Sequence, residues 1–151
     1  MRRIALMASV LGAAALLTAG LAVAQQTVTH PLVTPSVIQF DGAGSWACVG
    51  GIKLDPPTAG SYEFKNFDLG GGHIVTINLT ISYPGGKLTF ASTSGEFVTS
   101  VLVKGGPPAN LYNYSGITPA VYTDSGLTPP INPNNGKPYG FSHLCFYFDK
   151  E

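Results

Sequence analysis

Residues 74–82 constrain the fold more than any other part of the chain. Positions 75, 77, 79 and 81 are apolar, whereas positions 76, 78, 80 and 82 carry hydroxyl or amide side chains. A period of two places successive side chains on opposite faces, which predicts a β-strand with one buried face. The turn sequence Tyr-Pro-Gly-Gly follows at 83–86, and the alternation resumes at 87–91. The two segments therefore predict a β-hairpin.

The rest of the chain favours further short strands. Residues 36–40, 61–67 and 96–104 are strand candidates bounded by glycine, proline, serine or asparagine, and the chain holds 19 glycines and 12 prolines. Residues 96–104 are apolar on both faces, which predicts a central position in the sheet. After residue 24 no helical period of apolar residues persists for three turns. We predict an all-β, antiparallel β-sandwich, with jelly-roll and immunoglobulin-like topologies both open.

The first 24 residues have the pattern of a secretory signal peptide. Arg2 and Arg3 precede an apolar stretch, and Ala22-Val23-Ala24 fits the small-x-small cleavage rule. A transmembrane anchor is the alternative, but the strongly apolar part is short and is followed by small residues. We expect cleavage after Ala24 and export from a bacterium to the periplasm or the medium. The exported chain would consist of an extended lead-in at 25–35 and one β domain at 36–151.

The two cysteines, Cys48 and Cys145, are expected to pair because the destination is oxidising. Two free thiols and an intermolecular bridge are the alternatives. Cys145 lies within residues 140–148, the most apolar run after the leader. We predict that this run is a buried closing strand, tied by a disulfide to the start of the domain.

Charge excludes two classes of partner. After the leader there are six lysines, eight acidic residues and no arginine, which gives a formal net charge of −2. Nucleic-acid binding relies on a basic surface and on the guanidinium fork, so it is not expected. No basic amphipathic helix supports binding to a membrane surface.

Residues 105–140 form a stretch rich in glycine, proline and tyrosine, in which we expect an ordered long loop with short strands at 109–114 and near 121. Aromatic residues with a polar tip are common anchors of binding sites. The candidate ligand-binding residues are Trp46, Tyr112, Tyr114, Tyr122 and Tyr139. Carbohydrate and another surface protein are the expected partners. Packing of these rings within the loop's own core is the alternative.

Catalytic and metal-binding patterns are weak. The chain has no Gly-x-Ser-x-Gly elbow and no His-x-His pair, and His143 is interpreted as a structural residue near the disulfide. No cofactor is expected, with calcium on the oxygens of Asp124, Asn132 and Asn134 as an alternative. We predict a non-catalytic binding or structural module. A small hydrolase without a recognisable motif, or a subunit that assembles with itself through strand edges, are the alternatives.

The second half of the chain contains an ordered set of short motifs. They are Val103-Lys104-Gly105-Gly106, Asn110-x-Tyr112, Asp124-Ser125-Gly126-Leu127, Asn132-Pro133 and Gly140-x-Ser142-His143-x-x-Phe146. This order resembles a signature of uncharacterised bacterial secreted and surface β modules, "Val-Lys-Gly-Gly … Asn-x-Tyr … Gly-x-Ser-His-x-x-Phe-Cys". The resemblance covers residues 97–148 and implies an extracellular β module without an assigned activity. Here the cysteine is Cys145, which precedes Phe146 instead of following it.

Overall fold

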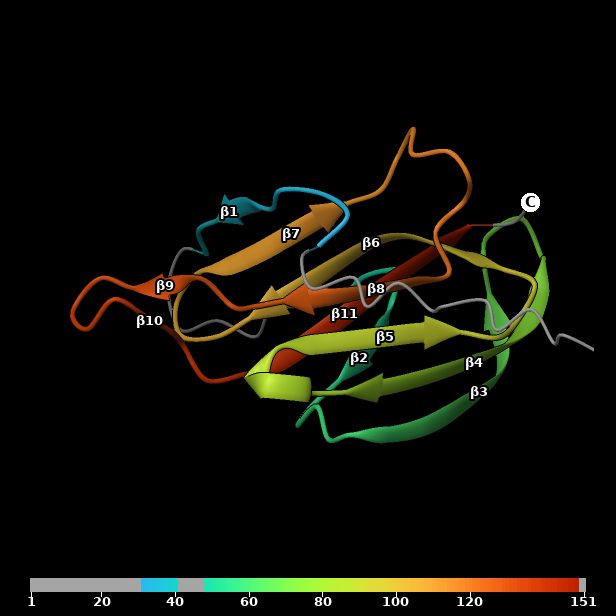
Figure 1. The fold of residues 1–151 in the computed structure, drawn as a ribbon. Coiled ribbons are helices and arrows are strands. Elements are labelled where there is room, and N and C mark those ends of the chain that lie inside the picture. Colours follow the sequence, from blue (N-terminus) through green and yellow to red (C-terminus); the bar gives the residue numbers. More distant parts are fainter. Residues whose placement is uncertain (1–30, 41–47, 150–151) are drawn as a thin grey trace, which may run out of the picture.

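The computed structural model describes residues 31–40 and 48–149, and they form two antiparallel sheets (Figure 1). Sheet A contains, in spatial order, β1 (Ser36–Ile38), β7 (Ala109–Asn113), β6 (Phe97–Lys104), β11 (His143–Asp149) and β2 (Ile52–Leu54). Sheet B contains β3 (Gly60–Asp68), β4 (Ile74–Ser82), β5 (Leu88–Ser92) and β8 (Thr123–Leu127). A separate hairpin consists of β9 (Ile131–Asn132) and β10 (Lys137–Pro138).

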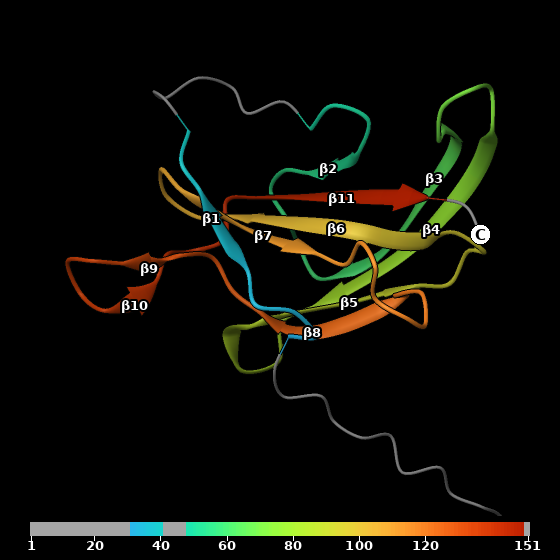
Figure 2. The ribbon, with the colours of Figure 1, turned by 90° about the horizontal axis from the view of Figure 1, so that it is seen from above.

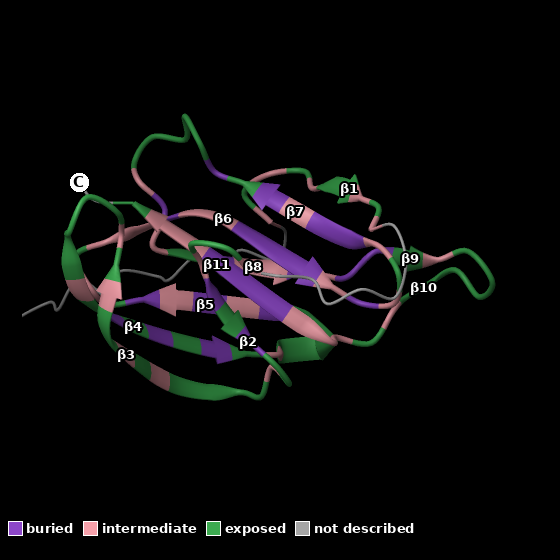
Figure 3. Ribbon diagram, turned by 180° about the vertical axis from the view of Figure 1, so that it is seen from behind, coloured by how far each residue is buried: buried purple, intermediate pink, exposed green. Residues whose placement is uncertain are grey.

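The two sheets pack face to face, and the strands of one run at an angle to those of the other (Figure 2). One apolar cluster joins side chains from β4, β5 and β8 of sheet B with side chains from β2, β6, β7 and β11 of sheet A. At its centre the rings of Phe90 and Phe146 meet edge to face, with centroids 5.4 Å apart. The prediction of an antiparallel β-sandwich is confirmed. Figure 3 shows that burial concentrates on β6, β7 and β11, whereas β3 and the β9–β10 hairpin are exposed.

The predicted hairpin is confirmed as β4 and β5. They pair in antiparallel register, with Ile81 opposite Phe90, and a single turn of 3-10 helix at Pro84–Gly86 connects them. Ile77, Leu79 and Ile81 are buried, and the polar residues between them are exposed, as the alternation predicted.

Strand β6 lies at the centre of sheet A, between β7 and β11, as its two-sided apolar character predicted. The pairing with β11 shifts register between Tyr147 and Phe148, so that Thr99 has no partner there. Because of this extra residue on β6, the side chains before and after it do not alternate between the two faces of the sheet. Val98 therefore belongs to the same buried cluster as Val101, although the alternation predicted opposite faces.

The disulfide between Cys48 and Cys145 is present, with Cα atoms 5.8 Å apart. The closing strand is β11, which pairs with β6 on one side and with β2 on the other. Cys145 points to the outer face of sheet A, into a second, smaller apolar cluster with Leu102 and Ala109. The bridge therefore connects the outer face of the sheet to the segment that leads into β2.

Residues 105–140 contain more regular structure than the predicted long loop. The strand expected at 109–114 is confirmed as β7, and the one expected near 121 is β8. β7 belongs to sheet A and β8 to sheet B, so the segment crosses between the two sheets. The hairpin β9–β10 was not predicted. Its strands are only two residues long, which is too short for a period-two pattern to show.

Three of the four outermost strands, β1, β2 and β3, carry features that discourage pairing with another chain. β1 and β2 are three residues long, and Lys53 lies in β2. β3 is longer, but its register shifts between Phe64 and Phe67, and Asn66 within this stretch has a φ of 56°. Short strands, lysines and bulges are the usual protection of an exposed edge. Within the described residues, no helix is long and apolar enough to cross a membrane.

Candidate functional site

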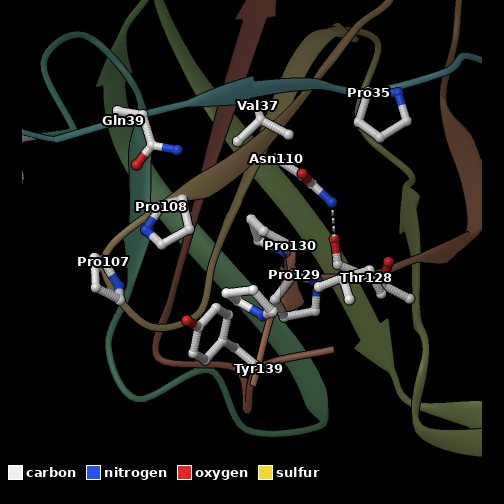
Figure 4. Close-up of a pocket in the computed structure, with 12 residues that line it drawn as sticks. Pro35, Val37, Gln39, Pro107, Pro108, Asn110, Thr128, Pro129, Pro130 and Tyr139 are labelled. Atoms are coloured by element: carbon white, nitrogen blue, oxygen red, sulfur yellow. Dashed lines mark hydrogen bonds between the residues drawn. The ribbon is translucent and has the colours of Figure 1, made fainter. Parts of the chain in front are cut away.

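A cleft of about 720 Å³ lies beside β1 (Figure 4). Its walls come from four segments: β1 with its flanking residues, the β6–β7 turn with β7, the connection from β8 into β9, and the residue after β10. The lining residues are Pro35, Val37, Gln39, Pro107, Pro108, Asn110, Thr128, Pro129, Pro130, Ile131, Pro133 and Tyr139. We call this the proline cleft, because six of the twelve are prolines.

Two adjacent glycines place Tyr139 in the wall of the proline cleft. A Cβ atom on Gly106 would lie 2.8 Å from two atoms of the Tyr139 ring, and Gly106 has a φ of 69° that favours glycine. A Cβ atom on Gly105 would lie 2.5 Å from the carbonyl oxygen of Gly140 and 2.6 Å from Pro129 Cβ. Both positions therefore require glycine for the β6–β7 turn to pack against Tyr139 and Pro129.

A buried tyrosine fixes the floor of the proline cleft. The Tyr112 hydroxyl accepts a hydrogen bond from the Thr128 N–H at 2.9 Å and donates one to the Thr128 carbonyl at 3.1 Å. Asn110 Nδ2 also donates to the Thr128 carbonyl, at 2.8 Å. These bonds hold the start of the β8–β9 connection against β7, and this connection carries Pro129 and Pro130.

The chemistry of the proline cleft is that of a binding surface. Among the described residues that line it there is no charged side chain, no histidine, no serine and no cysteine. Val37 is 58% exposed and Ile131 is 56% exposed, so apolar side chains lie open at the rim. An apolar cleft of several hundred Å³ with a few polar groups is the usual form of a ligand site.

Among the predicted aromatic site residues that the structure describes, only Tyr139 lines the proline cleft. Tyr112 and Tyr114 are instead 1% and 4% exposed and belong to the core between the sheets, which is the packing role that the sequence left as the alternative. Tyr122 is half-buried outside the cleft lining, and its carbonyl accepts a hydrogen bond from Ser92. Trp46 lies outside the described residues.

Asp124 is buried and ties the lead-in segment to β8. Its carboxylate accepts hydrogen bonds from the Tyr114 hydroxyl at 2.8 Å, from the Ser125 N–H at 2.7 Å and from the Leu32 N–H at 3.1 Å. Burial raises the pKa of Asp124 above its usual 3.8, although the three hydrogen bonds act in the opposite direction. Burial, and after it the charge of Asp124, also raises the pKa of Tyr114.

These contacts do not bring the oxygens of Asp124, Asn132 and Asn134 together as a calcium site would require. The Asp124 oxygens are engaged in the interior, whereas Asn134 is exposed in the turn between β9 and β10. The Asn132 side-chain oxygen accepts a hydrogen bond from the Asn134 N–H at 3.0 Å, which is a turn contact. Within residues 31–40 and 48–149, no three histidine, cysteine, aspartate or glutamate side chains lie close enough together to hold a metal ion.

The raised pKa of Asp124 makes a pH-dependent contribution to stability that the Asp124→Asn variant should lack. A carboxyl with a raised folded pKa contributes stability that is fully present below its unfolded pKa and is lost as pH rises through the folded pKa. We expect the free energy of unfolding of the wild type, minus that of the variant, to fall as pH rises above about 4. Urea unfolding at a series of pH values measures this difference. A difference that stays flat or rises with pH would contradict the prediction.

His143 contacts residues of β2 and its end rather than a cleft. Its Nε2 lies 2.9 Å from Asp55 Oδ2, and the Lys53 ammonium lies 3.1 Å from the same oxygen. Lys53, and after it His143, hold the pKa of Asp55 below its usual value. This contact joins β11 to the end of β2.

Sequence reasoning missed the prolines as site residues. Pro107-Pro108 and Pro129-Pro130 entered the sequence interpretation only through the glycine-, proline- and tyrosine-rich composition of residues 105–140. Both pairs lie within residues 105–140, the segment in which the sequence analysis placed most of its candidate binding residues. The sequence therefore pointed to this segment, but to its tyrosines and not to its prolines.

Comparisons with protein-family models, with curated proteins and with solved structures found no match to this chain.

Proposed function

We propose that the protein is an exported, non-catalytic binding module of the bacterial cell exterior, and that its ligand binds in the proline cleft. The observation that carries this proposal is the lining of the cleft, which is open, apolar and free of charged side chains among the described residues. Apolar surface that stays open to solvent in a folded domain marks a site of interaction. The disulfide and the signal-like leader support the export part of the proposal.

The same lining supports binding over hydrolysis. A glycosidase needs two positioned carboxylates, and an acyl-transfer enzyme needs a nucleophile next to a base. The lining residues that the structure describes supply neither set. Asp124, the buried acid nearest in sequence to the cleft wall at Thr128, has its carboxylate bonded to Tyr114, Ser125 and Leu32 instead.

A lysine in the wall of the cleft tests where the ligand binds. Val37→Lys places an ammonium group against the apolar lining, and a ligand that covers it must desolvate that charge. We expect retention of the labelled protein on insoluble polysaccharides and on immobilised cell-surface proteins to fall at least tenfold. Because Val37 is 58% exposed, the free energy of unfolding should change by less than about 0.5 kcal/mol.

Ile74→Lys is the matched control, because Ile74 is 54% exposed at the start of β4, outside the cleft lining. It should leave retention within twofold of the wild type. Equal retention of both lysine variants would show that the ligand binds elsewhere. The export part is tested separately by the mass of the exported protein, which should correspond to a chain that begins at Gln25.

A further inference from the structure

Besides the side chains of Gln39, Thr128 and Tyr139, the proline cleft has few hydrogen-bonding groups to offer a ligand. Six of its lining residues are prolines, which have no N–H. At the floor, the N–H and carbonyl of Thr128 and the Nδ2 of Asn110 are already bonded within the protein. A sugar displays a hydroxyl on most of its ring carbons, and each one buried without a partner costs about 1–3 kcal/mol. The lining therefore disfavours a saccharide and favours apolar side chains, which need no such partners.

The uncharged lining also restricts the part of the ligand that enters the cleft. A charged group that leaves water without an opposite charge or sufficient hydrogen bonds pays a large desolvation cost. No lysine, aspartate or glutamate is among the lining residues described. The complementary ligand surface is therefore neutral as well as apolar.

Two walls of the proline cleft are extended segments. Pro35, Val37 and Gln39 alternate along β1, so their side chains share one face of the strand, and Figure 4 shows Pro129, Pro130 and Tyr139 across the cleft from them. At about 3.3 Å per residue the β1 wall is about 13 Å long. An extended chain of four or five residues has this length, and it directs every second side chain to the same side.

The walls are also rigid, which favours binding of a short segment. Proline side chains lose almost no conformational entropy when a ligand covers them. Tyr139 is held by close contacts with Gly105 and Gly106. A preorganised site keeps more of its contact energy as affinity, because less is lost in ordering side chains.

We infer that the ligand is an extended, uncharged segment of a partner protein that inserts apolar or aromatic side chains at alternate positions into the proline cleft. This inference rests on the proposed function and names the partner for that same site. The side chains at positions i and i+2 of the segment lie between the β1 wall and the wall that carries Pro129, Pro130 and Tyr139. The polar side chains between them stay in solvent.

Fluorescence anisotropy with labelled peptides tests the inference on the purified protein. The probes are N-acetylated, C-amidated heptapeptides of serine and threonine that carry Phe, Tyr, Leu, Ile or Val at positions 3 and 5. Matched probes place the same two residues at positions 3 and 4, or replace one with aspartate or lysine. Neutral pentasaccharides of glucose and of N-acetylglucosamine form the third set.

We expect the best peptides with alternating apolar residues to bind at least tenfold more tightly than their adjacent or charged counterparts. Val37→Lys should remove this binding, and Ile74→Lys should retain it within twofold. Tighter binding of a pentasaccharide, lost in Val37→Lys, would overturn the inference and leave the proposed function standing. Binding that is insensitive to Val37→Lys, or no binding of any probe, would overturn both.

Discussion

Replacing both cysteines with alanine is expected to lower the free energy of unfolding by about 4–5 kcal/mol. Cys48 and Cys145 are 97 residues apart, so the bridge closes most of the described domain. A cross-link over a loop of this length removes much of the conformational freedom of the unfolded chain. Few other single features of a domain this small contribute as much, since total stability is about 5–15 kcal/mol.

Guanidinium unfolding of the wild type and of the Cys48→Ala/Cys145→Ala variant measures the difference. Reductant provides the control, because it should destabilise the wild type and leave the variant unchanged. The Gly51→Ala variant tests the packing of the same bridge, since its Cβ would lie 2.8 Å from Cys145 Sγ and 2.9 Å from Cys48 Sγ. A double-alanine variant as stable as the wild type would show that the bridge contributes nothing to the fold.

The sequence predicted those parts of the fold that depend on local patterns. The alternation at 74–82 predicted β4 correctly, because one face of this strand is buried and the other is in solvent. The pairing of Cys48 with Cys145 was predicted because a chain with two cysteines that is exported to an oxidising compartment is expected to form a disulfide. By contrast, β2 has only three residues, and its short Ile-Lys-Leu pattern gains meaning only through pairing with β11. Such long-range pairing cannot be read from a local window.

The site was harder to predict than the fold, because tyrosine is common both in buried cores and on binding surfaces. Tyr112 and Tyr139 lie in the same irregular segment and look alike in the sequence. The register of β7 with β6 places Tyr112 opposite Val101, on the face that packs against sheet B. Tyr139 follows the β9–β10 hairpin and packs on the glycines of the β6–β7 turn. Only the tertiary arrangement separates the two roles.

The structure also gives a physical reason for several motifs of the resemblance noted in the sequence. Gly105 and Gly106 make room for Tyr139, and Asn110 bonds to the wall of the proline cleft. Ser142 donates hydrogen bonds from its N–H and its hydroxyl to the Lys104 carbonyl, which joins the start of β11 to the same turn. Of these residues Asn110 lines the proline cleft, and Gly105 and Gly106 contact Tyr139 in its wall.

Truncation of Tyr112 should therefore act mainly on the stability of the fold, and truncation of Tyr139 mainly on ligand affinity. Tyr112→Ala removes a ring that is 1% exposed, together with both hydrogen bonds to Thr128, and should lower the free energy of unfolding by about 3–5 kcal/mol. Tyr139→Ala removes a half-buried ring and should cost about 1 kcal/mol or less. The same Tyr139→Ala variant should weaken the best peptide found for the proline cleft at least tenfold.

Tyr112→Phe separates the ring of Tyr112 from its hydroxyl. The ring stays packed in the core, but the Thr128 N–H loses its partner and the Thr128 carbonyl keeps only the bond from Asn110 Nδ2, which costs about 1–3 kcal/mol. Because Thr128 begins the wall that carries Pro129, peptide affinity should fall in this variant as well, although Tyr112 itself touches no ligand. Denaturant unfolding and anisotropy on the same samples measure both quantities. If Tyr139→Ala proved as destabilising as Tyr112→Ala and left the affinity unchanged, Tyr139 would be a core residue and the wall assigned to it would be wrong.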